Sequence, residues 1–167
     1  MQNHLKQVAV VGRSNVGKSS FINAFTNQKI AVTSKTPGRT QSLICYDLGF
    51  KQPFHVNIVD FPGYGFAKAP GKEVEKWKKL TTAYFDHSST LDTTVVLVDS
   101  RRGLGDLDKM LFEMLEDMQK KYVMVLTKAD IATHEDLNVT LDQLDYYIKP
   151  LKLHVNNEED VVICSRH

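Results

Sequence analysis

The chain has 167 residues, of which 42% are hydrophobic and 25% are charged, and its formal net charge is +1. This length suits one domain with a sizeable core, and the composition is typical of a soluble globular protein. The balanced charge gives no global signal for nucleic acid, so any RNA contact would come from a local patch, and no apolar run approaches membrane-spanning length.

Strand and helix patterns alternate along the chain, which is typical of an α/β fold. We expect strands at residues 5–11, 42–48, 54–60, 93–99, 122–127 and 160–164, and helices at 18–27, 73–87, 106–120 and 134–148. The connection at 49–53 is too short for a crossover helix, so the strands on either side of it should be antiparallel. The sequence predicts three layers: a mixed, mostly parallel six-stranded sheet with one antiparallel strand, and helices on both faces.

The segment GRSNVGKSS fits G-x-x-x-x-G-K-[ST] and lies between the first predicted strand and helix, the context that a P-loop requires. Its backbone N–H groups and the helix N-terminus would bind phosphates. Lys18 would reach the β- and γ-phosphates, and the Ser19 hydroxyl would bind Mg²⁺. An ordinary glycine-rich turn is the weaker alternative. The candidate nucleotide-binding residues here are Gly12, Arg13, Ser14, Asn15, Val16, Gly17, Lys18, Ser19 and Ser20.

Two further segments have the positions expected of loops around a γ-phosphate. In the loop before the second strand, a hydroxyl of Thr36 or Thr40 should complete the Mg²⁺ shell in the triphosphate state. Asp60-Phe61-Pro62-Gly63 follows the third strand, as a Walker-B aspartate does; Asp60 would hold Mg²⁺ through water, and the Gly63 N–H would bond the γ-phosphate. The alternative for this second segment is a plain turn, which its place after a P-loop disfavours.

Thr127-Lys128-Ala129-Asp130 follows the fifth strand and resembles the [NT]KxD guanine motif. A carboxylate at Asp130 can accept from guanine N1–H and the 2-amine, which adenine does not offer, so the motif would select GTP over ATP. The Lys128 stem would cover the base. Cys164 and Ser165 end the last strand, where the backbone of a short loop would meet guanine O6.

The two cysteines, Cys45 and Cys164, are in apolar strand-like runs and outside any CxxC pattern. Buried thiols in a reducing compartment are therefore expected. No histidine is assigned to metal or catalysis. Basic residues gather around the second loop and its helix, with arginines elsewhere, and could hold RNA phosphates; a solvated helix face is the alternative. They are Lys68, Lys72, Lys76, Lys78, Lys79, Arg39, Arg101 and Arg102.

The motifs GRSNVGKSS, TPGRTQ, DFPGYGFAK and TKAD, with their spacing, resemble the EngB (YihA/YsxC) GTPases of the TrmE–Era–EngA–EngB branch. The resemblance implies a P-loop NTPase G domain over residues 1–167 that binds the large ribosomal subunit precursor and its rRNA and acts in assembly. Within the family pattern PGRT, its threonine is the Mg²⁺ ligand, which matches Thr40 after Pro37, Gly38 and Arg39. The family continues into a last helix, whereas this chain ends at His167, so we expect that helix to be missing or trimmed.

Catalysis is expected to be slow, because Tyr64 stands where Ras-like enzymes place a water-orienting glutamine. Asn15 occupies the position where TrmE-like relatives place a ligand of bound K⁺, which could supply charge near the β–γ bridge. A turn residue that holds the loop backbone is the equal alternative for Asn15. The expected ligands are GTP or GDP with Mg²⁺, and K⁺ under the first alternative.

A second functional class is a signalling or trafficking switch that binds protein effectors. Tyr64 in place of glutamine and the lack of a lipidation motif at the end of the chain weigh against it. A metabolic P-loop kinase or ATPase is disfavoured by TKAD. We expect a monomer, located in the cytoplasm if the protein is bacterial, with the matrix of a mitochondrion or plastid as the alternative. No signal peptide or arginine-rich transit segment is visible at residues 1–7.

Overall fold

The computed structural model describes residues 5–32, 42–48, 55–65, 71–148 and 161–163. They form one six-stranded sheet in the order β2-β3-β1-β4-β5-β6. The strands are β1 (Lys6–Gly12), β2 (Ile44–Leu48), β3 (Val56–Asp60), β4 (Leu91–Asp99), β5 (Tyr122–Thr127) and β6 (Val161–Ile163). β2 pairs antiparallel with β3 and the other neighbours pair parallel, as the short connection between these two strands predicted.

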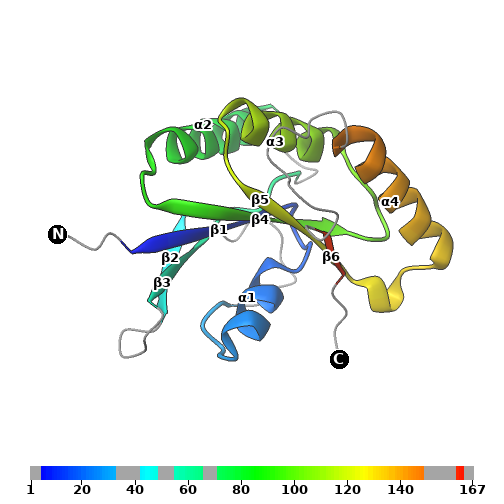
Figure 1. Ribbon diagram of the computed structural model, residues 1–167, viewed down its shortest axis with the longest axis horizontal. Helices are drawn as coiled ribbons and strands as arrows, with labels where there is room; N and C mark the ends of the chain where they lie inside the picture. The colour runs from blue at the N-terminus through cyan, green and yellow to red at the C-terminus, as the bar shows by residue number, and fades with distance from the viewer. Residues whose placement is uncertain (1–4, 33–41, 49–54, 66–70, 149–160, 164–167) are drawn as a thin grey trace.

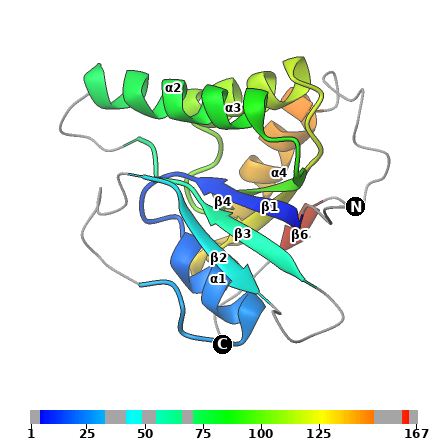
Figure 2. The ribbon, with the colours of Figure 1, turned by 90° about the vertical axis from the view of Figure 1, so that its left-hand side faces the viewer.

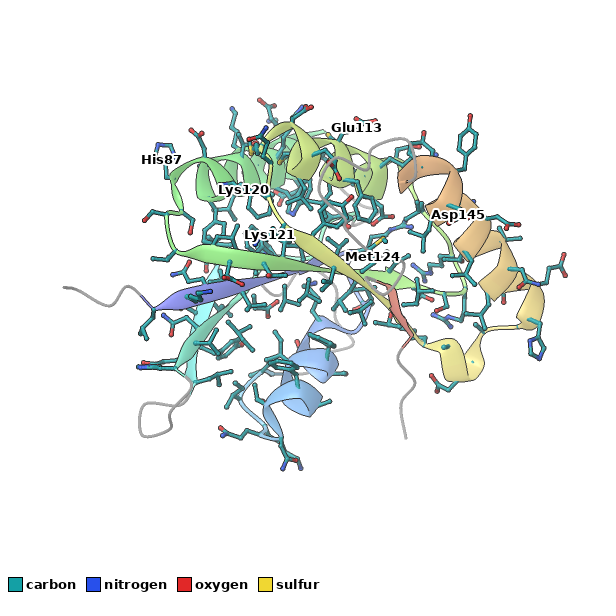
Figure 3. All side chains as sticks on the ribbon, in the orientation of Figure 1. His87, Glu113, Lys120, Lys121, Met124 and Asp145 are labelled. Carbon is teal, nitrogen blue, oxygen red and sulfur yellow. The ribbon has the colours of Figure 1, made fainter. Side chains whose placement is uncertain are left out.

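The helices lie in two layers on opposite faces of the sheet (Figure 1). They are α1 (Lys18–Thr26), α2 (Lys72–His87), α3 (Asp106–Asp117) and α4 (His134–Ile148), with a short 3-10 helix η1 at Ala129–Ile131. α2 and α3 cover one face and α1 the other, and the view turned by 90° shows α1 beneath β2 and β3 (Figure 2). Side chains fill the space between the sheet and each layer of helices (Figure 3).

Each layer has its own hydrophobic cluster, because the central parallel strands present apolar side chains to both faces. On the α2–α3 face, fully buried Phe61, Phe85 and Phe112 lie at the centre. On the α1 face, Ile22 packs with Val10 and Leu97 of the sheet. On α3, Met114 belongs to the buried cluster of the α2–α3 face, and the partly buried Met118 packs against it.

Several element bounds shift by one or two residues, and two differences from the sequence prediction are larger. α3 ends at Asp117 rather than at residue 120, and Gln119 takes a left-handed backbone conformation with φ 53°. Cys45 is exposed, not buried: on β2 it alternates with Tyr46 and Leu48, which pack against the α1-side cluster, so its side chain lies on the opposite face of this outermost strand. Within the described part of the chain, no helix is long and apolar enough to cross a membrane.

Candidate nucleotide site

The backbone between β1 and α1 is shaped to receive an anion. Asn15 and Gly17 have φ values of 62° and 116°, and Gly17 is the N-cap of α1 but has no side chain to occupy the first helical N–H groups. The helix begins with the bond from Phe21 N–H to the Gly17 carbonyl. N–H groups without a capping side chain, at the positive end of a helix, favour a phosphate.

Lys18, the first residue of α1, and Asp60, the last residue of β3, bring opposite charges to this loop. The Lys18 ammonium donates to the Gly12 carbonyl at 3.3 Å, and burial lowers its pKa while the Asp60 carboxylate partly opposes the shift. Burial raises the pKa of Asp60 to about 6, with Lys18 opposing. A buried ammonium in this loop is suited to bind an anion with more negative charge than a single carboxylate, such as a phosphate group.

One oxygen of Asp60 carries the clearest sign of an absent ligand. Asp60 is 3% exposed, and its Oδ1 has no hydrogen-bond partner among the described residues. Buried carboxylate oxygens are usually satisfied, and a hydrated divalent cation is a natural partner. Ser19 is half-buried at the start of α1. The described residues contain no group of three or more histidine, cysteine or acidic side chains that could bind a metal. A serine hydroxyl and one carboxylate would suit an ion such as Mg²⁺ that takes its remaining ligands from phosphate and water.

The segment after Asp60 is bound to the P-loop. Ser14 N–H donates to the Tyr64 carbonyl at 2.8 Å, and Ser14 Oγ donates to the Gly63 carbonyl at 3.0 Å. A Cβ added at Gly63 would lie 2.8 Å from Ser14 Cα and 2.9 Å from Lys18 Nζ. Only glycine therefore fits this approach, and the structure places the predicted Gly63 beside the lysine of the P-loop.

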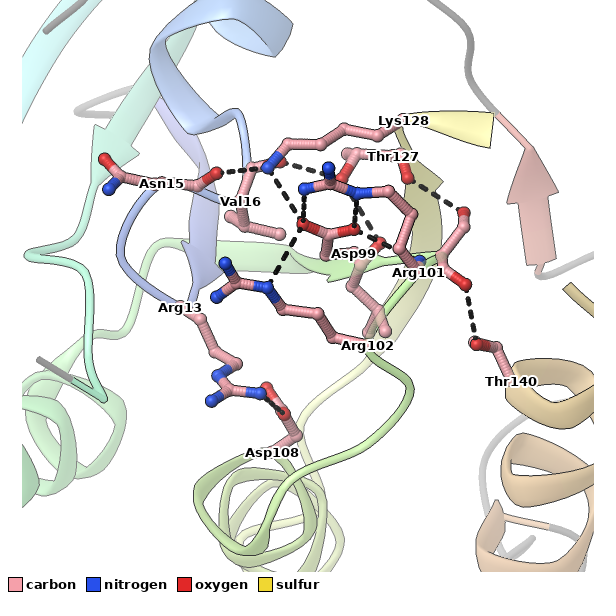
Figure 4. Close-up of polar contacts among 12 residues, drawn as sticks. Arg13, Asn15, Val16, Asp99, Arg101, Arg102, Asp108, Thr127, Lys128 and Thr140 are labelled. Atoms are coloured by element: carbon pink, nitrogen blue, oxygen red, sulfur yellow. Dashed lines mark hydrogen bonds and ion pairs between the residues drawn. The ribbon is translucent and has the colours of Figure 1, made fainter. Parts of the chain in front are cut away.

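Lys128 is held by a cluster at the ends of β4 and β5 (Figure 4). Its ammonium donates to the Asn15 carbonyl at 2.6 Å and to Asp99 Oδ2 at 2.8 Å. The buried Asp99 also accepts two bonds from the Arg101 guanidinium, at 3.0 and 2.9 Å. Burial would raise the pKa of Asp99, but the hydrogen bonds from Arg101 and Lys128 outweigh it and hold that pKa well below its usual range.

Thr127 is turned toward the P-loop. Its hydroxyl is buried and donates to the Val16 carbonyl at 2.7 Å, joining β5 to the phosphate-binding loop. Asp130 lies three residues farther on, on η1, where its carboxylate is exposed. The structure thus brings the TKAD segment and the P-loop together over 111 positions of sequence.

The basic residues proposed from sequence divide into two groups. On α2, the lysines are exposed, and Lys76 and Lys79 form ion pairs with Glu73 and Glu75 of the same helix, as expected of a solvated face. Arg101 and Arg102 instead surround Asp99.

Several predicted positions lie outside the described residues: Thr36, Pro37, Gly38, Arg39, Thr40, Lys68, Cys164 and Ser165.

Sequence reasoning missed two buried carboxylates near the site, Asp99 and Asp108. For Asp99 a signal was available, because Asp-Ser-Arg-Arg directly follows an apolar strand. For Asp108 there was none, since an aspartate in the first turn of a helix usually faces solvent.

Residues 7–128 match the family model described as "50S ribosome-binding GTPase". The chain is 40% identical to a probable GTP-binding protein EngB of Rhodospirillum rubrum over 96% of this chain and 69% of that one. A crystal structure of a probable GTP-binding protein engB has a TM-score of 0.72 and 24% identity, covering 95% of this chain and 88% of that one. Era in complex with MgGDPNP and part of 16S ribosomal RNA has a TM-score of 0.71 and 20% identity, covering 97% and 52% of the two chains.

The fold and the matched family define a P-loop GTPase. Within this class, the chain belongs to the EngB family of GTP-binding proteins.

Proposed function

We propose that this GTPase is a nucleotide-dependent assembly factor for the large ribosomal subunit. The proposal is supported above all by the match of residues 7–128 to a 50S ribosome-binding GTPase family, together with a site that joins the P-loop, the DxPG segment and the TKAD segment. The partner would be the precursor of the large subunit, contacted through its rRNA. The protein would act as a monomer, and residues 1–167 would form a single G domain.

The residue roles follow from the chemistry of a nucleoside triphosphate. Lys18 and the N-terminus of α1 would bind the β- and γ-phosphates. Ser19 and Thr40 would hold Mg²⁺ directly and Asp60 through water; the bound ion would neutralise charge on the phosphates. The Gly63 N–H would bond the γ-phosphate. Asp130 would accept from guanine, and the backbone at Cys164 and Ser165 would meet its O6.

A sedimentation experiment tests the proposed partner. We expect the protein to sediment with large-subunit particles when bound to a non-hydrolysable GTP analogue, and to remain in the supernatant with GDP. Lys18→Ala is the matched control, since it should remove nucleotide binding and hence the difference. Equal sedimentation with both nucleotides, or none with either, would contradict a nucleotide-dependent assembly factor.

Hydrolysis is proposed to be slow, with K⁺ bound near Asn15 as the source of added charge. Asn15 is exposed, and the Lys128 ammonium at its backbone carbonyl would repel a second cation there. The side-chain amide oxygen is therefore the expected ligand of such an ion. Asn15→Gly removes that side chain and still permits the φ of 62°. We expect faster hydrolysis in KCl than in NaCl at equal ionic strength for the wild type, and no such difference for Asn15→Gly. Equal rates in both salts for the wild type would exclude the ion.

A further inference from the structure

The side chain of Tyr64 is buried in the core, although its backbone lies against the P-loop. The residue is 2% exposed, and its ring lies 4.6 Å from the ring of Trp77 on α2, measured between centroids. Its hydroxyl donates to Asp108 Oδ1 at 2.6 Å. The phenol therefore joins the DxPG segment to the first turn of α3.

Asp108 is a fully buried carboxylate, and burial raises its pKa despite its partners. Its Oδ2 accepts the Gly105 N–H at 2.8 Å and lies 4.0 Å from Nη1 of Arg13 in the P-loop. Arg13 and Asp108 can be followed at the bottom of Figure 4. Burying a carboxylate is costly unless it is paired and hydrogen-bonded. A residue needed only to begin α3 could perform that role from an exposed position.

The peptide between Gly63 and Tyr64 is thus held from two directions. On one side, Ser14 donates to the carbonyl of this peptide, that of Gly63, and to the next carbonyl, that of Tyr64. On the other side, the Tyr64 phenol is fixed by Asp108. Arg13 connects the two sides, because it pairs with Tyr64 as an isolated parallel bridge and its guanidinium approaches Asp108.

We propose that Asp108 is a positioning residue of the GTPase site, which acts through the Tyr64 hydroxyl to hold Gly63 in register with the P-loop. The inference rests on the proposed role of Gly63 as the contact of the γ-phosphate. GDP lacks that phosphate, so Asp108 and Tyr64 affect the triphosphate state selectively. They favour GTP by reducing the number of positions that Gly63 can take before the nucleotide binds.

The test compares Tyr64→Phe, Asp108→Asn and the double variant in the full chain. Asp106→Asn is the matched control, because Asp106 is exposed in the same turn of α3. Calorimetry gives the dissociation constants for GDP and for a non-hydrolysable GTP analogue, and single-turnover measurements give the hydrolysis rate at saturating GTP. The emission maximum of Trp77, the only tryptophan, should stay at its wild-type position in Tyr64→Phe if the ring remains packed.

We expect each single variant to weaken binding of the GTP analogue by about fivefold more than it weakens binding of GDP, a factor typical of coupling between sites. The double variant should lose no more than the worse single variant, because both remove the same interaction. The hydrolysis rate should fall in the same variants, and Asp106→Asn should match the wild type.

The inference is overturned if the ratio of the two dissociation constants, for the GTP analogue and for GDP, is unchanged in both single variants. If both affinities fall equally, Asp108 has a structural role only. If Asp108→Asn does not fold, Tyr64→Phe decides alone, since Asp108 keeps its bond from Gly105. Failure of the wild type to bind GTP would instead contradict the proposed function, so the two failures are distinct.

Discussion

At the scale of single residues, the site depends on charges that were removed from water and then paired. Lys18, Asp60 and Asp99 are each shifted in pKa by their surroundings, but with different signs. Burial dominates at Lys18 and Asp60, whereas hydrogen bonds dominate at Asp99. The first two are therefore poised for a ligand, and the third is already satisfied within the protein.

Lys18→Ala should weaken GTP binding by more than about tenfold, or 1.4 kcal/mol, because it removes the cation buried among the phosphates. Isothermal titration measures the change. Lys29→Ala, an exposed lysine just after α1, is the control and should bind as the wild type does. An affinity within about threefold of wild type would show that Lys18 does not reach the phosphates.

Asp130→Asn should shift preference from GTP toward XTP. Xanthine has a carbonyl in place of the 2-amine of guanine, so an amide becomes the better partner at that edge of the base. Competition between the two nucleotides gives the ratio of affinities. A variant that still prefers GTP would mean that Asp130 does not contact the base.

Asp99→Asn should lower the free energy of unfolding at pH 7 by about 1–3 kcal/mol, since Arg101 and Lys128 lose a charged acceptor. The folded-state pKa lies below the ordinary value of 3.8, so this stability is present above that value and is lost as the pH falls. The difference in the free energy of unfolding between wild type and variant should therefore become smaller below about pH 4. Thermal unfolding from pH 7 to pH 3 measures it, with the exposed Asp117→Asn as control; a gap that widens on acidification would contradict the sign.

At the scale of elements, the site forms where the carboxyl ends of β1, β3, β4 and β5 meet, because parallel strands place these ends at one edge. Thr127 shows how tightly the elements are joined there. Its hydroxyl binds the carbonyls of Val16 and Val98, so β5, β4 and the P-loop share one buried side chain.

Thr127→Ala should weaken the binding of GTP and of GDP by the same factor, about three- to tenfold, because the P-loop loses its hydrogen bond from β5. The preference for GTP over XTP should not change, since the hydroxyl points to the loop. Thr127→Ser keeps the hydroxyl and should restore most of the affinity. Loss of base preference at full affinity would instead make Thr127 a contact of the base.

At the scale of the whole molecule, two segments that would contact the γ-phosphate flank the β2–β3 pair in the sequence. Residues 28–41 contain Thr40 and residues 61–71 contain Gly63. Each gains a contact only in the triphosphate state, so both should exchange amide hydrogens more slowly with a non-hydrolysable GTP analogue than with GDP. Mass spectrometry of the exchanged peptides measures this, with α4 as an internal control. Equal exchange in both segments would leave the protein without a nucleotide-dependent surface.

The sequence by itself determined the order of the elements, the antiparallel pair and the position of the P-loop. Hydrophobic periodicity and glycine patterns are local, so they can be seen in a short window of residues. The predicted burial of Cys45 was wrong, because the exposure of a strand residue depends on whether another element covers that face of the sheet.

Only the tertiary structure decided which charges meet. Tyr64 and Asp108 are 44 positions apart, and Asp99 and Lys128 are 29 apart, so no local pattern connects them. In its own segment Asp108 resembles a solvent-facing residue of a first helical turn, and the Asp-Ser-Arg-Arg run that marks Asp99 does not identify Lys128 as its partner. The sheet order brings these segments to one edge, and the cost of burying a charge there then selects the partners that satisfy it.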